Sequence, residues 1–253
     1  MKLQKVYLYS AFFALVFPFA VMANGREGDA ANDSNKLAFI GRAFDPATGA
    51  ILYTERHNIQ LSSQGQYLSA EVTYQDALNK VFAHKRMQYA NNPTLPETYF
   101  YEVDSPFSFK VVPEKTGVLA LSYSDEQEQF EQVVSIPESG FSVVDAGFDR
   151  LVQQQWADLL AGKTVRFNFL AVTRADFYEF RLSKSERSDT NTLVLKLEPH
   201  NAVFRWLLDP AFLMYEQKSG RLMRFEGLTN IRKRIDGQAQ DENYVAVIEY
   251  DYL

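Results

Sequence analysis

The chain contains no cysteine among its 253 residues and only 3 histidines. Without cysteine it has no disulfide framework, thiolate nucleophile or iron–sulfur site. His57, His84 and His200 lack metal-binding spacing, so the sequence predicts no metal site. The absence of a Gly-x-Ser-x-Gly elbow and of a phosphate-binding glycine loop leaves an α/β serine hydrolase or a nucleotide-dependent enzyme without support, and we predict no cofactor. A net charge of −6 disfavours a nucleic-acid partner.

Long apolar runs are also scarce, and only the run between Val6 and Met22 approaches the length of a membrane span. Two lysines precede it, and small or modest residues stand before Asn24, so residues 1–23 are typical of a secretory signal peptide cleaved after Ala23. The alternative is an uncleaved N-terminal anchor. Because exported eukaryotic domains usually carry cysteine, we predict a bacterial periplasmic protein without stable membrane insertion after cleavage.

The remainder of the chain has the pattern of one mainly β domain. Residues 24–35 are polar and without periodicity, which predicts a flexible leader. Alternating segments separated by turn residues then predict antiparallel strands. They cover 37–44, 51–59, 66–74, 80–89, 98–103, 107–112, 118–123, 129–136, 165–171, 177–183, 192–197, 212–217, 221–228 and 244–252.

Apolar residues change to helical spacing between positions 145 and 160, which predicts one amphipathic helix capped by Asp145 and ended by Gly162. Residues 201–208 are predicted to be a short helix or an irregular turn. We therefore expect a single antiparallel β domain over 36–253, built as a large curved antiparallel sheet or half-barrel with one amphipathic helix packed on it. Whether the sheet closes is left open.

Acid–base chemistry has one candidate, the pair Glu55 and His57. Tyr53, Glu55 and His57 alternate along one strand, so their side chains share a face and can form a general acid–base pair. The alternative is that they decorate a solvated strand face, which is common in antiparallel sheets.

Aromatic residues make up 14% of the chain, with 20 Phe and 14 Tyr, enough to wall an apolar pocket. The same residues can instead fill a large β core. The candidate ligand-binding residues are Trp156, Phe167, Phe169, Phe204, Trp206, Tyr215, Phe225, Arg221 and Arg224. The two arginines, with the basic run 232–234, are candidates for holding an anionic group, and the alternative is a charged edge that discourages aggregation.

Three stretches resemble an uncharacterised family of exported Gram-negative bacterial proteins: residues 41–57 (GRAFDPATG, then LYTERH), 144–149 (VDAGFD) and 220–231 (GRLMRFEGLTNI). The resemblance covers nearly all of the chain after residue 23 and carries no known function. Residues 204–206 (FRW), followed by a proline and a hairpin, are more distantly similar to the periplasmic lipoprotein carriers. That resemblance implies a half-barrel that holds acyl chains against helices.

These observations favour a non-enzymatic periplasmic protein that binds a hydrophobic or amphipathic, lipid-like envelope ligand between the sheet and the predicted helix. One competing hypothesis is an envelope hydrolase that uses Glu55 and His57, with Arg221 or Arg224 holding an anion. Another is a structural or interaction protein that pairs with a partner through a sheet edge.

Overall fold

The computed structural model describes residues 35–253 apart from 90–91, 115–116 and 236. The predicted signal peptide and all of the predicted leader except Asn35 lie outside these residues. A single sheet of 15 strands dominates the fold, in the order β8-β7-β6-β5-β4-β3-β2-β1-β15-β14-β13-β12-β11-β10-β9. Neighbouring strands are antiparallel except β9 and β10, which are parallel. The expected large antiparallel sheet is therefore confirmed, and over the described residues it does not close.

The first eight strands form a meander that follows the chain. They are β1 (Lys36–Phe44), β2 (Ile51–Leu61), β3 (Tyr67–Asp76), β4 (Val81–Gln88), β5 (Glu97–Glu102), β6 (Ser108–Pro113), β7 (Val118–Ser124) and β8 (Gln129–Ser135). The remaining strands are β9 (Phe141–Val143), β10 (Val165–Ala171), β11 (Asp176–Lys184), β12 (Thr192–Pro199), β13 (Ala211–Glu216), β14 (Leu222–Ile235) and β15 (Gln238–Tyr252). The two halves meet where β1 pairs with β15.

The predicted amphipathic helix is present but is interrupted at Gln155, giving α1 (Gly147–Gln154) and α2 (Trp156–Leu160). Gly162 follows α2 with a positive φ of 80° and donates its N–H to the Leu159 carbonyl, so its predicted role is confirmed. The prediction that Asp145 caps the helix is wrong. The cap position belongs to Ala146, which makes no side-chain capping bond, while the Asp145 carboxylate accepts from Lys85 instead.

Short helical segments lie outside the main helix. A 3-10 turn, η1 (Val172–Arg174), joins β10 to β11, and α3 (Ala202–Leu207) follows β12, so the helical alternative for residues 201–208 is the observed one. Asn201 caps α3, because its side chain accepts from the Val203 N–H at 2.8 Å.

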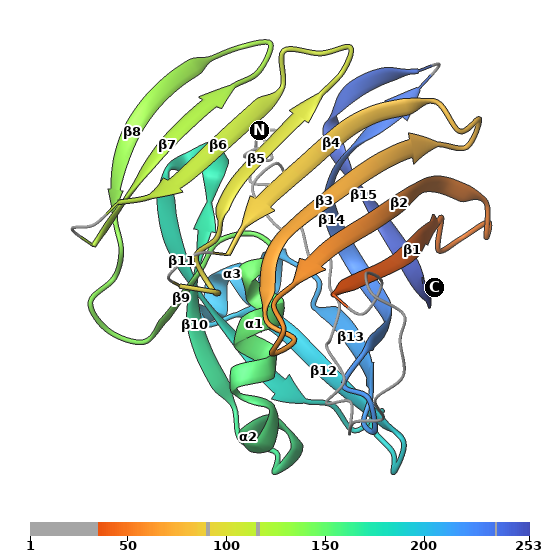
Figure 1. Cartoon of the computed structure of the whole chain (residues 1–253), viewed down its shortest axis with the longest axis vertical. Coiled ribbons are helices and arrows are strands. Elements are labelled where there is room, and N and C mark those ends of the chain that lie inside the picture. The colour runs from red at the N-terminus through yellow and green to blue at the C-terminus, as the bar shows by residue number, and fades with distance from the viewer. Residues whose placement is uncertain (1–34, 90–91, 115–116, 236) are drawn as a thin grey trace, which may run out of the picture.

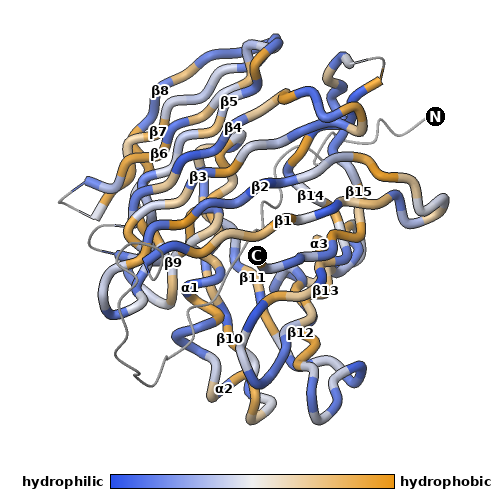
Figure 2. Tube along the Cα trace, turned by 45° about the vertical axis from the view of Figure 1, so that its right-hand side comes forward, coloured by the Kyte–Doolittle hydropathy of each residue, from blue (hydrophilic) through white to orange (hydrophobic). Residues whose placement is uncertain are grey.

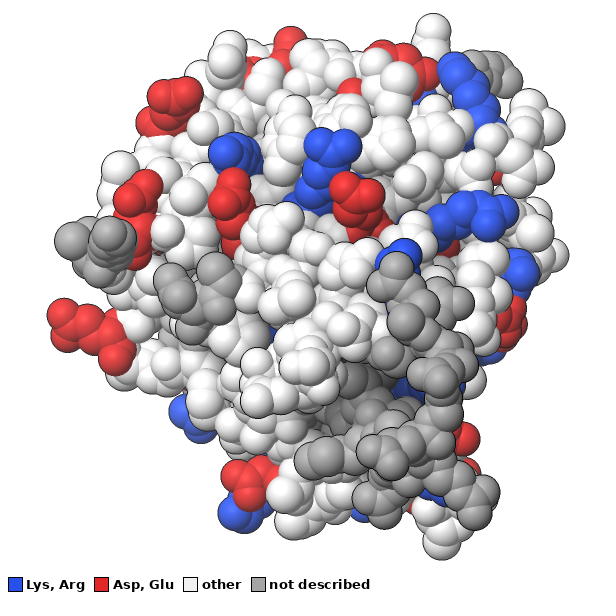
Figure 3. Space-filling view, viewed as in Figure 1, with Lys and Arg blue, Asp and Glu red and all other residues white. Residues whose placement is uncertain are grey.

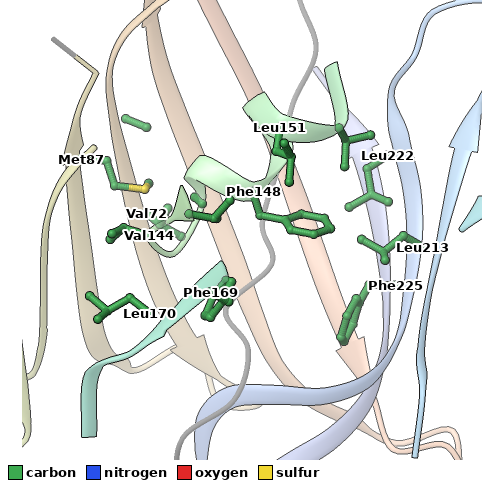
Figure 4. Packing of buried hydrophobic residues seen from close by; sticks show 14 of the residues in the cluster. Val72, Met87, Val144, Phe148, Leu151, Phe169, Leu170, Leu213, Leu222 and Phe225 are labelled. Carbon is green, nitrogen blue, oxygen red and sulfur yellow. The ribbon is translucent and has the colours of Figure 1, made fainter. Parts of the chain in front are cut away.

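Helices α1 and α2 lie inside the curve of the sheet, between the strands β1–β8 and the strands β9–β13 (Figure 1). Phe148 and Leu151 of α1 are fully buried. Figure 4 places them between Val72 on one side and Leu213 on the other, so the helix fills the concave face and joins the two halves of one core. Burial of such side chains stabilises the fold by about 1.5–3 kcal/mol each.

Alternation along the strands separates the two faces of the sheet, as the hydropathy colours of Figure 2 show. Acidic and basic side chains are interspersed on the outer face of the first half (Figure 3), where Arg86 pairs with Glu71 and Lys110 with Glu97. Edge strand β8 presents exposed Glu131, a device that opposes edge-to-edge pairing. In the described part of the chain, no helix has the length and apolar character needed to cross a membrane.

The sequence pattern misses the far end of the β14–β15 hairpin, where β14 runs on to Ile235 and β15 begins at Gln238. Arg232 explains why this polar stretch is ordered. Its guanidinium donates to Glu102 at 2.7 and 3.1 Å and to Glu126 at 2.8 Å, and it lies 4.6 Å from the centre of the Phe107 ring. The hairpin is thereby tied to β5 and to the turn before β8 by contacts between residues remote in sequence.

Candidate functional site

A group of ionisable side chains lies inside the core, on the concave face of β2 and β4. Tyr53, Glu55 and His57 project inward from β2 and are 1%, 1% and 3% exposed. The interpretation that they decorate a solvated face is therefore wrong, because helix α1 and the facing strands cover this side of the sheet. His57 Nε2 lies 3.2 Å from Glu55 Oε2, and the imidazole stacks on Phe39 with ring centroids 4.1 Å apart.

Lys85 and Asp145 complete this group, which we call the ionic cluster: Glu55, His57, Lys85 and Asp145. Lys85 Nζ donates to both Asp145 oxygens, at 2.8 and 3.0 Å, and lies about 6 Å from the Tyr74 and Phe100 ring centres. Asp145 has a positive φ of 45°, a conformation that few non-glycine residues adopt. The ion pair therefore fastens the approach to α1 onto strand β4.

Burial controls protonation in the ionic cluster. Desolvation raises the pKa of Glu55 to about 8, although the nearby Lys85 charge and the Tyr53 hydroxyl act in the opposite direction. Desolvation also lowers the pKa of His57 well below its usual value, and the Lys85 charge adds to this effect. At neutral pH the carboxyl is therefore largely protonated and the imidazole is neutral.

Glu55 is also fixed by packing against the neighbouring strand. In the sheet register, Gly41 lies between Glu55 on β2 and Tyr250 on β15. A Cβ on Gly41 would stand 2.8 Å from Tyr250 Cε1 and 3.1 Å from Glu55 Oε2. Glycine is the residue that leaves room here for the carboxyl and the ring to lie over the backbone.

This geometry gives a hydrolytic role little support. Glu55, His57, Lys85 and Asp145 are each 6% exposed or less, so no member of the ionic cluster extends to the surface where a substrate could reach it. Arg224 is held by ion pairs to Glu226 and Glu249, and Arg221 is separated from His57 by the stacked rings of Phe39 and Tyr252. The ionic cluster has its partners within the core, and its position favours a role in fixing α1.

Apart from Arg224, which is held in the ion pairs described above, the predicted ligand-binding residues fall into three groups. Phe167, Phe169 and Phe225 are 1–4% exposed and belong to the packed core. Tyr215 lies near the end of β13 and Arg221 directly before β14, and the ring of Trp156, on α2, is 5.7 Å from that of Tyr215. Phe204 and Trp206 are on α3.

The basic run is neutralised within the protein. Arg234 pairs with Asp104 at 3.2 Å, Lys233 pairs with Glu242 at 2.7 Å, and Arg232 is held as described above. Its charge is therefore used to attach the β14–β15 hairpin, a role that a run of basic letters does not reveal.

A cavity of about 620 Å³ lies between α3 and the start of β11. Its lining comprises Phe177, Tyr178, Glu179, Phe180, Pro199, His200, Asn201, Ala202, Phe204 and Leu208. We call this the aromatic cavity. The Phe204 ring meets Tyr178 edge to face, with centroids 6.2 Å apart. Of the predicted ligand-binding residues, Phe204 is part of this lining.

His200 supplies a polar group to the aromatic cavity. Its Nε2 lies 3.9 Å from Glu179 Oε2, and its buried Nδ1 has no hydrogen-bond partner among the described residues. In the sequence His200 is an isolated polar residue, because Glu179 lies on another strand, β11. Asn201 is the signal that could have located this site, because an asparagine at this position can cap a helix that begins beside it.

Comparison of the chain with family models, with curated proteins and with solved structures yields no match.

Proposed function

We propose that this protein is a non-enzymatic periplasmic binding protein whose aromatic cavity takes a hydrophobic or amphipathic ligand of the cell envelope. The observation that carries the proposal is the cavity itself. Its volume of about 620 Å³ lies within the range of small-molecule sites, and four of its ten lining residues are Phe or Tyr. The proposed periplasmic localisation is based on residues 1–23, which resemble a signal peptide.

The lining favours a ligand with an apolar body and one polar end. Phe177, Tyr178 and Phe204 offer ring faces to an acyl chain or a flat apolar group. His200 Nδ1 and the Glu179 carboxylate stand together as hydrogen-bonding groups for the polar end.

Helix α3 adds an exposed apolar surface beside this cavity. Trp206 is 86% exposed and Val203 is 66% exposed, while the neighbouring Phe204 turns toward the cavity. Phe204 thus lines the cavity while Val203, next to it on the same helix, faces solvent. Substitutions at these two positions form a matched pair of variants.

The test is a titration with the apolar dye N-phenyl-1-naphthylamine. We expect its fluorescence to rise to a saturable end point in the wild type, and Phe204→Ala to weaken dye binding about tenfold, because truncating one anchoring ring typically costs more than 1 kcal/mol. Val203→Ala on the same helix is the control and is expected to bind as the wild type does. Equal binding by all three proteins would show that the dye binds outside the aromatic cavity and would contradict the proposal.

A second measurement addresses the natural ligand. Protein purified from its native periplasm is extracted with organic solvent, and the extract is analysed by mass spectrometry. We expect a stoichiometric lipid-like molecule in the wild-type extract and a depleted one from Phe204→Ala. Recovery of no such molecule from either protein would count against lipid carriage.

A further inference from the structure

A second group of polar side chains is gathered at the other end of β13, far along the sheet from the aromatic cavity. The antiparallel register places the starts of β3 and β14 and the ends of β13 and β15 at the same end of their neighbouring strands. Inward side chains there include Tyr67, Tyr215 and Tyr252. On the helical side, Asp149, Gln153 and Trp156 stand at spacings of four and three residues and so share one face.

The carboxyl of Asp149 lies at the centre of this group. Gln153 Nε2 lies 3.4 Å from Asp149 Oδ1. Burial and then the Asp149 charge raise the pKa of the Tyr67 and Tyr215 hydroxyls, and both also raise the pKa of Tyr252. The Asp149 charge therefore acts on phenols from three different strands, β3, β13 and β15.

Two guanidinium groups lie at the margin of the group. Arg150 stacks on the Tyr67 ring at 4.4 Å and Arg221 on the Tyr252 ring at 4.7 Å. Both arginines are partly exposed, as are Gln153 and Trp156, so the group extends to the protein surface. We call Tyr67, Asp149, Gln153, Trp156, Tyr215 and Arg221 the polar ring.

The polar ring has many hydrogen-bonding atoms without partners. Among the described residues, no partner is found for the buried Tyr67 and Tyr215 hydroxyls, Asp149 Oδ2, Gln153 Oε1 and Arg221 Nε. Asp149 is only 2% exposed and Tyr215 is fully buried. Buried polar atoms are normally paired, so a concentration of unpaired ones needs an explanation, and a ligand that pairs with them supplies one.

We propose that the polar ring binds a neutral polyhydroxylated group, a saccharide ring. Asp149 Oδ2 and Gln153 Oε1 are acceptors, and Arg221 Nε is a donor. A ligand that pairs with all three must both donate and accept hydrogen bonds, as a hydroxyl group does. An anion would face the Asp149 carboxylate, and a cation would face Arg150 and Arg221. The rings of Trp156 and Tyr215, which meet at 71°, offer apolar surface to the C–H face of a sugar.

The test uses tryptophan fluorescence. The chain has 2 tryptophans, so Trp206→Phe leaves Trp156 in the polar ring as the sole reporter. This variant is titrated with the methyl glycosides of glucose, galactose and N-acetylglucosamine. We expect a saturable change with at least one of them, and binding about tenfold weaker after Asp149→Asn or Tyr215→Phe.

Three outcomes decide the proposal. No saturable change with any glycoside up to ~50 mM would overturn it, because a built site binds at least that tightly. Binding that Asp149→Asn and Tyr215→Phe both leave unchanged would also overturn it. Binding lost in these variants but retained in Tyr99→Phe, a change at a partly exposed tyrosine on β5, supports it. Circular dichroism and the unfolding midpoint of each variant show that the fold is kept.

The saccharide can be free or the head group of a glycolipid, and a further arm of the experiment separates the two. Octyl β-glucoside below its micelle concentration is compared with methyl β-glucoside. Equal affinity assigns the site to free saccharide, whereas octyl glucoside binding at least tenfold tighter assigns it to a lipid-linked one. In a Phe204→Ala background the same gain shows that the chain lies outside the aromatic cavity, so this result is independent of the proposed function.

Discussion

The ionic cluster and the polar ring are two groups of buried polar residues in one core, and they differ in how they are satisfied. Lys85 and Asp145 form a two-pronged ion pair, and Glu55 contacts His57. In the polar ring, by contrast, Asp149 Oδ2 and the Tyr67 and Tyr215 hydroxyls have no partner among the described residues. A satisfied group fixes structure, whereas an unsatisfied one reduces stability unless something binds it. The predictions below test this difference.

Lys85→Met should have the largest effect. It leaves the Asp145 carboxylate buried without its partner, which costs about 3–5 kcal/mol in the free energy of unfolding. Urea unfolding measures the loss. Lys80→Met is the matched control, because Lys80 is exposed and its pair with Asp104 is expected to contribute less than about 1 kcal/mol. Equal losses in the two variants would show that the ionic cluster does not fix α1 to the sheet.

Gly41→Ala should disturb the ionic cluster through packing. The added methyl group would contact Tyr250 Cε1 at 2.8 Å, and overpacking of this kind costs about 1–3 kcal/mol. Combining it with Tyr250→Leu, which removes the ring, should recover part of the loss in thermal unfolding. A variant as stable as the wild type would mean that the sheet adjusts freely at this position.

Stability should fall as the pH rises from 6.5 to 8. Glu55 has its pKa raised from 4.5 to about 8 and Asp149 from 3.8 to about 7, so the folded state holds protons that the unfolded chain has released. The stabilisation from these two carboxyl groups is complete below their pKa values in the unfolded chain. It is lost as the pH rises through their pKa values in the folded state. His57, whose folded pKa is lowered, affects only the range below about 6.5.

The expected decline over this window is about 1–2 kcal/mol, measured by urea unfolding at several pH values. Glu55→Gln should flatten most of it, and the remaining slope below pH 7 belongs to Asp149. A wild-type stability independent of pH between 6.5 and 8 would mean that Glu55 is ionised in the folded state.

The sequence predicts the fold better than the sites, and the residues show why. The spacing of apolar residues in a strand or helix is a local property of the sequence. The alternation in β2 and the apolar stripe from Phe148 to Leu160 can therefore be recognised from the sequence alone. The pairing of Arg232 with Glu102 spans 130 positions, so nothing local predicted that β14 would continue to Ile235.

Sites depend on which inward residues meet across the core, and periodicity does not contain that information. Tyr53, Glu55 and His57 were correctly assigned to one face, but the choice of a buried face follows from α1 packing above them. Phe167, Phe169 and Phe225 have the same aromatic chemistry as Phe204. Tertiary contacts decide that the first three lie in the core and that Phe204 lines a cavity.

The smallest expected effect has the opposite sign and completes the comparison. Tyr67→Phe and Tyr215→Phe each remove a buried hydroxyl without a described partner while keeping the ring, so each should raise the free energy of unfolding, by roughly 1 kcal/mol. Tyr123→Phe is the control, because its hydroxyl donates to Asp125 at 2.7 Å and its loss should destabilise. Thermal unfolding without added glycoside measures all three. If Tyr67→Phe and Tyr215→Phe lower stability as Tyr123→Phe does, the hydroxyls of the polar ring are satisfied in the free protein, and the two clusters have the same structural role.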